Sequence, residues 1–190
     1  MYKKFTIIFA LGAFFLLITG CTSSIKKEDV SQTTNITNLT IATIGVSPSI
    51  DSDKVKFETI QLKDLKSENA KLSEKFDAIF IMPEFFNEAA ADKYISAYEM
   101  LKIPTFFIES KKDELPFINK DVSYETAPKI NSGNFATGYL NKISTKKEFS
   151  YMTWKYQLSN NLDKKDAIEL VYTQIFETIS DLKSQVPNKN

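Results

Sequence analysis

Polar residues that could carry chemistry follow three apolar runs of the sequence. Carboxylates at such positions can transfer protons or, together with hydroxyls, supply the oxygen ligands that a hard cation such as Ca²⁺ prefers. Polar residues also begin wherever a strand leaves a protein core, which is the simpler explanation for them. The candidates are Ser47, Ser49 and Asp51 after the first run, Glu84 after the second, and Glu109, Ser110 and Lys111 after the third.

The residue types that the chain lacks narrow this chemistry. The sequence has no histidine, and all 24 of its basic residues are lysine. Without histidine, catalysis by Ser-His-Asp or Cys-His groups and metal sites built on imidazole are excluded. Without arginine, bidentate recognition of phosphate or carboxylate is excluded too. An enzyme built from this chain would have to use carboxylates and a metal, and the composition favours a protein that is not an enzyme.

Nucleotides and nucleic acids are not expected as ligands. The hydroxyl-rich loop at 47–52 resembles the phosphate loop of flavodoxins, but it lacks a glycine and carries Pro48, which has no N–H to donate. The chain contains no G-x-G-x-x-G, Walker A or G-x-S-x-G motif. Its 24 basic and 24 acidic residues balance, which gives no reason to expect a basic face for nucleic acid. We therefore predict no cofactor and no nucleic-acid partner.

Apolar patterning predicts the elements that position these residues. Runs without helical periodicity indicate buried strands, alternation indicates strands nearer an edge, and apolar spacings of three and four indicate helices. Strands are predicted at 39–46, 55–62, 76–82, 103–108 and 149–156, and helices at 63–75, at 88–102, and from 160–163 to a point before Pro187. The segment 113–147 shows no regular pattern, apart from a turn at 132–134.

The order of these elements predicts a single three-layer α/β domain. Residues 76–108 form a strand, a helix and a strand, a βαβ unit that favours parallel pairing. The whole domain is expected to have a mostly parallel sheet, flavodoxin-like or half-Rossmann, with 149–156 as a possible antiparallel edge strand. In such sheets ligands bind beyond the carboxyl ends of the strands. The candidates Ser47, Ser49, Asp51, Glu84, Glu109 and Lys111 would then share one rim.

Two aromatic groups could form a contact for a partner protein. Phe85 and Phe86 follow Pro83 at a turn, and Tyr151 and Trp154 lie on the predicted edge strand, on opposite faces. Each group could instead cover the sheet as part of the core, and for Phe85 and Phe86 the core is the favoured alternative. The sequence leaves both alternatives open.

The first 21 residues carry the most specific pattern in the chain. Lys3 and Lys4 precede an apolar run from Phe5 to Ile18, which is too short to span a bilayer, and Leu17 leads into Ile18-Thr-Gly-Cys21. This arrangement resembles the lipobox signal of bacterial lipoproteins, and Cys21 is the only cysteine. The resemblance implies cleavage before Cys21 and a diacylglycerol on its sulfur. It also implies a palmitate-type membrane anchor on the extracytoplasmic side of a bacterial cell membrane.

Function is predicted from this address and from what the composition excludes. Residues 1–20 would be the signal peptide, 21–38 the lipidated cysteine and a polar tether, 39–186 the α/β domain and 187–190 a tail. The leading hypothesis is a membrane-anchored lipoprotein that acts as a non-catalytic interaction module for an envelope protein. The alternatives are a lipoprotein that binds a small ligand or a metal, and a metal-dependent hydrolase in which Asp51, Glu84 and Glu109 meet.

Overall fold

A computed structural model of the chain describes residues 36–130, 133–142 and 150–185, which fall in one compact unit. The predicted signal peptide at 1–20, Cys21, the first part of the tether up to residue 35 and the tail at 187–190 lie outside the described residues. None of the described helices is long and apolar enough to cross a bilayer.

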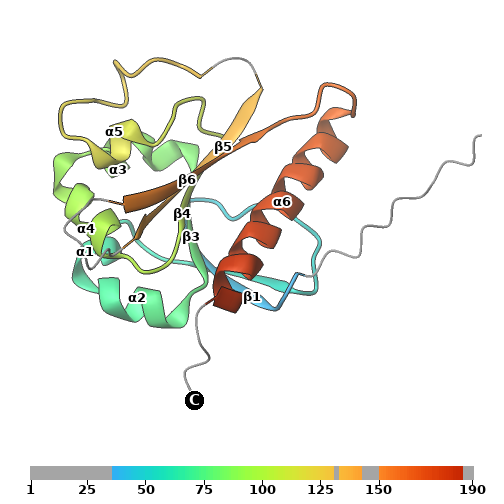
Figure 1. The fold of residues 1–190 in the computed structure, drawn as a ribbon, viewed down its shortest axis with the longest axis horizontal. Coiled ribbons are helices and arrows are strands. Elements are labelled where there is room, and N and C mark those ends of the chain that lie inside the picture. The colour runs from blue at the N-terminus through green and yellow to red at the C-terminus, as the bar shows by residue number, and fades with distance from the viewer. Residues whose placement is uncertain (1–35, 131–132, 143–149, 186–190) are drawn as a thin grey trace, which may run out of the picture. The chain divides into compact units, whose positions relative to one another are not determined.

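The fold is α/β, with six described strands in one sheet of order β2-β1-β3-β4-β5-β6 (Figure 1). The first four strands pair in parallel, and β5 and β6 are antiparallel to their neighbours. The predicted mostly parallel sheet with an antiparallel edge is therefore confirmed. The strands are β1 (Leu39–Ile44), β2 (Val55–Thr59), β3 (Ala78–Ile81), β4 (Thr105–Ile108), β5 (Asn134–Lys142) and β6 (Ser150–Gln157).

Alternate residues of the central strands enter two separate cores, one on each face of the sheet. In β4, Phe107 packs under the short helices while Phe106 and Ile108 pack under the last helix, as a period of two requires. The first core contains a stacked pair, Phe107 and Phe117, with ring centroids 3.6 Å apart. Because β1, β3 and β4 are buried on both faces, their sequences read as continuous apolar runs, which is why they were predictable.

The short helices cover one face of the sheet and α6 covers the other (Figure 1). The predicted helix at 63–75 is divided at Glu68, and the predicted continuous helix at 88–102 is wrong. Ala91 has an extended backbone, and a 3₁₀ turn follows it. The helical elements are α1 (Asp64–Ser67), α2 (Asn69–Lys75), η1 (Pro83–Phe85), α3 (Phe86–Ala89), η2 (Asp92–Tyr94), α4 (Ile95–Met100), α5 (Leu115–Ile118) and α6 (Lys164–Gln185).

Strand β5 was not predicted, because Gly138 interrupts its apolar pattern. A Cβ at position 138 would lie 2.7 Å from the Phe106 ring and 3.0 Å from the Trp154 ring. The missing side chain is thus replaced by two aromatic rings from the neighbouring strands. A glycine inside a strand often marks such a close approach. The prediction that 113–147 is irregular is therefore wrong for Asn134–Lys142.

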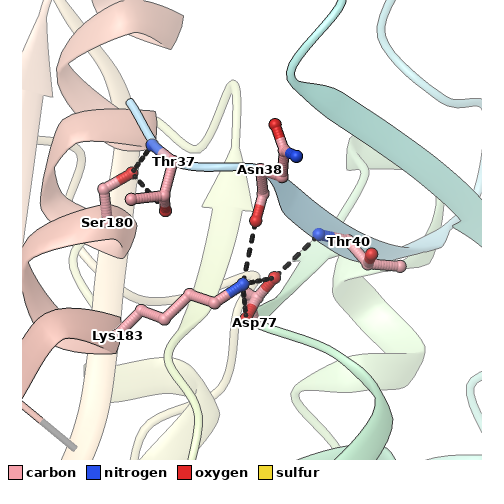
Figure 2. A network of polar contacts seen from close by, with 6 residues as sticks. All are labelled: Thr37, Asn38, Thr40, Asp77, Ser180 and Lys183. Carbon is pink, nitrogen blue, oxygen red and sulfur yellow. Dashed lines mark hydrogen bonds and ion pairs between the residues drawn. The ribbon is translucent and has the colours of Figure 1, made fainter. Parts of the chain in front are cut away.

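Polar contacts tie α6 to the amino ends of β1 and β3 (Figure 2). The Lys183 ammonium lies 3.0 Å from the Asp77 carboxylate and donates to the Asn38 carbonyl at 2.8 Å. Asp77 also accepts a bond of 2.8 Å from the Thr40 N–H. Ser180 accepts from the Thr37 N–H at 3.1 Å. We call Thr37, Asn38, Thr40, Asp77, Ser180 and Lys183 the amino-end clamp.

Candidate functional site

The carboxyl ends of β1 and β3 meet where the strand order reverses direction. In an open α/β sheet this switch point is where ligands bind. After β1 the chain passes through Gly45 to Val46, whose side chain is 77% exposed. After β3, Pro83 begins η1, and the Glu84 carboxylate accepts a hydrogen bond of 2.8 Å from the Val46 N–H. One residue predicted for the rim, Glu84, therefore does lie at the switch point and holds the end of β1 in place.

Gly45 makes this approach possible. Its φ is +109°, a backbone conformation that residues with a side chain rarely adopt. A Cβ at position 45 would also lie 2.4 Å from Glu84 Oε1 and 2.7 Å from Met82 Cβ. Any larger residue would displace the Glu84 carboxylate, so the glycine and the carboxylate form one arrangement.

The position of Glu84 disfavours an anionic ligand at the end of β1. The Val46 N–H is the kind of backbone donor that a phosphate accepts from in nucleotide-binding folds. Here a carboxylate of the protein already takes it, and its negative charge would repel a phosphate. This supplies a structural reason, besides the missing glycines of the 47–52 loop, to expect neither flavin nor nucleotide.

Among the described residues, the other candidates for the rim make no hydrogen bond with Glu84. Ser49 and Asp51 are exposed, Ser47 is partly exposed, and the neighbouring Ile50 packs against the core under α6. Lys111 is exposed as well. Within the ranges that the structure describes, no three acidic, histidine or cysteine residues are grouped so that they could hold a metal ion. The three carboxylates that the hydrolase hypothesis requires, Asp51, Glu84 and Glu109, form no such group.

Glu109 has an unusual backbone at the end of β4. Its φ is +60°, the left-handed region that only glycine enters without cost. Its side chain is exposed, and its charge contributes, after burial, to raising the pKa of Tyr172 on α6. The charge of Glu109 is therefore felt at Tyr172, on the α6 side of the sheet.

Ser110, the polar residue next to it, is structural. It is fully buried, donates to the Lys112 carbonyl at 2.9 Å, and its own carbonyl accepts from Asn134 at 2.6 Å. Lys112 is 8% exposed; its ammonium donates to the carbonyls of Tyr124 and Glu125 and lies 4.6 Å above the Tyr124 ring. This network attaches the segment after β4 to β5.

A cavity of about 490 Å³ lies beside the switch point, within the volume range typical of small-ligand sites. Its lining combines the end of β2, the residue after β1, and side chains of η1 and α3. The lining residues are Gly45, Thr59, Ile60, Gln61, Leu62, Lys63, Phe85 and Glu88. Apart from Phe85, none of them was a predicted site residue, because the sequence does not reveal that β2 ends beside β1 and η1.

The four aromatic candidates have different positions. Phe86 is 3% exposed and packs against Phe107 and Phe117, so its assignment to a partner contact is wrong. Phe85 is partly buried and lines the cavity. Tyr151 and Trp154 lie on β6, which is an edge strand as predicted.

The two β6 residues face opposite sides of the sheet. Trp154 packs towards the core under α6, with its ring centroid 6.1 Å from that of Phe106. Tyr151 is 49% exposed and lies against Tyr139 on the other face, with ring centroids 5.7 Å apart. Tyr151 is therefore the most accessible of the four predicted contact residues.

Comparison with protein-family models, with curated proteins and with solved structures found no match for this chain.

Proposed function

We propose that this protein is a membrane-anchored extracytoplasmic lipoprotein whose α/β domain acts as a non-catalytic interaction module for an envelope protein. The lipidated residue would be Cys21, within the lipobox-like sequence Leu17–Cys21. The observation that carries the proposal is the position of the amino-end clamp. In this clamp, Ser180 and Lys183 of α6 bind Thr37 and Asn38, the last residues of the predicted tether, at the amino ends of the parallel strands.

With the proposed anchor, the direction of the strands would determine which end of the domain faces the membrane. A tether attached at the amino end of β1 leaves the domain at the amino ends of the strands. The carboxyl ends of β1, β2, β3 and β4 all point to the opposite end of the domain, because these strands are parallel. The surface around Val46, Glu84 and the cavity would face away from the bilayer. This is the side from which a partner in the envelope could approach.

The exposure of Val46 supports a contact at this surface. A valine 77% exposed is ordinary when alone, but this one is held by the Glu84 bond to its N–H and lies beside a cavity with an apolar lining. The bond fixes the backbone at Val46, so a partner that covers this residue has less backbone conformational entropy to remove.

We also propose a flavodoxin-like relationship for the sheet. The order β2-β1-β3-β4 agrees with the order of that fold, which continues with a fifth strand beside the fourth. The antiparallel direction of β5 departs from it.

Lipid attachment is tested by comparing the chain with its Cys21→Ser variant in a bacterial host supplied with labelled palmitate. We expect label on the unaltered chain and none on the variant. We also expect the cleaved form of the chain in the membrane fraction of cells with the unaltered chain, and no cleaved form there with the variant. An unaltered chain that remains unlabelled would refute the anchor.

The interaction surface is tested by placing a photo-crosslinking amino acid at Val46 or Tyr151 of the full chain in cells. Gln174, exposed on α6, provides the matched control. We expect a discrete crosslinked species at Val46 and none at Gln174. Equal crosslinking at all three positions, or none at Val46 and Tyr151, would count against an interaction module at these surfaces.

A further inference from the structure

The cavity beside the switch point has a lining that selects for a particular kind of small molecule. Ile60, Leu62 and Phe85 give it an apolar part, while Lys63 and Glu88 place opposite charges on it. Ligand sites commonly combine an apolar interior with a few polar groups that fix orientation. A ligand that matches this lining has an apolar body and carries both a negative and a positive group.

Lys63 is the lining residue with a free charge. Its ammonium forms no ion pair with any residue in 36–130, 133–142 or 150–185, and its side chain is exposed. It stands at the start of α1, next to Asp64, whose carboxylate is occupied by the Gln61 N–H at 2.8 Å. A carboxylate entering the cavity would therefore find an ammonium that is not ion-paired within the described ranges.

Glu88 is only weakly engaged. Its carboxylate lies 3.6 Å from the Lys93 ammonium and 3.4 Å from the Tyr94 hydroxyl, and its side chain is 55% exposed. Contacts of this length and exposure contribute little, so a ligand ammonium could displace Lys93 at small cost. Glu84, whose carboxylate lies against Gly45, adds negative charge on the same side.

We propose that this cavity binds a zwitterion with an apolar side chain, its carboxylate at Lys63 and its ammonium at Glu88. A free apolar amino acid and a short apolar peptide share this chemistry. The inference goes beyond the interaction module proposed above and does not depend on the lipid anchor.

The test uses calorimetric titration of the detergent-solubilised full chain with leucine and with leucyl-leucine, which distinguishes the two sources. Three further titrants each remove one feature: N-acetyl-leucine lacks the ammonium, leucinamide lacks the carboxylate, and glycine lacks the apolar side chain. We expect leucine or its dipeptide to bind, and each of the three to bind at least about fivefold more weakly, the equivalent of roughly 1 kcal/mol.

Paired variants assign each charge to its residue. Lys63→Met should weaken binding of the zwitterion about fivefold and leave leucinamide unchanged, while Glu88→Gln should weaken it similarly and leave N-acetyl-leucine unchanged. Lys66→Met on α1 and Glu74→Gln on α2 remove exposed charges that do not line the cavity and should have no effect. No heat with either zwitterion at millimolar concentration would overturn the proposal. Equal affinity for all titrants, or equal effects of the cavity and control variants, would overturn it too.

Discussion

The amino ends and the carboxyl ends of the parallel strands are built in different ways. At the amino ends, the amino-end clamp joins β1, the start of β3 and the last turns of α6, which are up to 145 residues apart in sequence. At the carboxyl end of the strands, Val46 after β1 donates its N–H to the Glu84 carboxylate after β3. Among the described residues, this is the one hydrogen bond between these two strand ends that involves a side chain. The amino ends of the strands therefore hold the layers together, while the carboxyl ends of β1 and β3 leave side chains accessible.

We expect this difference to separate stability from the binding proposed above. Long-range polar contacts at the amino ends fix the position of α6 over its core, so changes there should affect unfolding and leave ligand or partner contacts unaltered. Changes at Lys63, Glu88 or Val46 should do the reverse, because these side chains are exposed and carry little of the packing. Functional sites commonly lie on accessible loops held by a rigid scaffold, as this arrangement suggests.

The largest effect on stability is expected from Gly45→Ala. A large loss would show that the carboxyl end of β1 also contains one position that tolerates no side chain. The variant places a side chain at a φ of +109° and within 2.7 Å of Met82 Cβ. Backbone strain and overpacking together should lower the free energy of unfolding by about 2–4 kcal/mol. The measurement is chemical denaturation followed by circular dichroism.

Gly133→Ala provides the matched control for this prediction. Gly133 has a similar φ of +106°, but among the described residues the nearest atom to a Cβ there would be the Leu158 carbonyl oxygen at 3.8 Å. It should therefore show the strain alone, with a smaller loss than Gly45→Ala. Equal losses in the two variants would mean that the contacts with Glu84 and Met82 do not restrict position 45.

A smaller loss is expected from Asp77→Ala, which removes the centre of the amino-end clamp. Its carboxylate is 18% exposed and binds both the Lys183 ammonium and the Thr40 N–H. Leaving these donors unpaired should cost about 1–3 kcal/mol. Asp77→Asn keeps an acceptor for Thr40 and should recover part of the loss. A clamp variant with unaltered stability, or one that alters crosslinking at Val46, would contradict the separation of the two ends.

Sequence patterns sufficed for elements that are buried on both faces or regularly amphipathic. Leu39–Ile44, Ala78–Ile81 and Thr105–Ile108 were predicted because their apolar residues are buried on both faces of the sheet. The start of α6 was also predictable, since Asp163 accepts a hydrogen bond from the Asp166 N–H at 3.0 Å, as an N-cap residue does. Among the candidate residues, the position of Glu84 beside the end of β1 was predictable, because the carboxyl ends of neighbouring parallel strands lie at the same end of a sheet.

The remaining features depend on contacts between distant residues. Gly138 conceals β5 because the rings that fill its place belong to β4 and β6. The regular apolar spacing across 88–102 predicted one helix, but Tyr98 instead donates to the Ala89 carbonyl at 2.8 Å, across the break at Ala91. Phe86 could not be told from an exposed aromatic until Phe107 and Phe117 were seen to surround it. The cavity was not predictable for the same reason, because its lining comes from three separate segments.

The smallest effect is expected from the ion pairs of Glu58 on β2 with Lys56 and Lys75, which provide a comparison between the amino-end clamp and more exposed charges. Hydrogen bonds from Lys56 and then from Lys75 lower the pKa of Glu58 from its usual value of 4.5 to about 2. Since the folded state binds this proton less tightly than the unfolded state, the stabilisation is complete above pH 4.5. It is lost as the pH falls towards 2.

Glu58→Gln should therefore melt slightly below the unaltered chain at pH 6, and the difference should narrow between pH 4.5 and 2 in thermal unfolding curves. High salt should reduce the difference at pH 6, as it does for exposed pairs. A difference that is independent of pH would mean that Glu58 acts through packing on the edge strand and not through its charge.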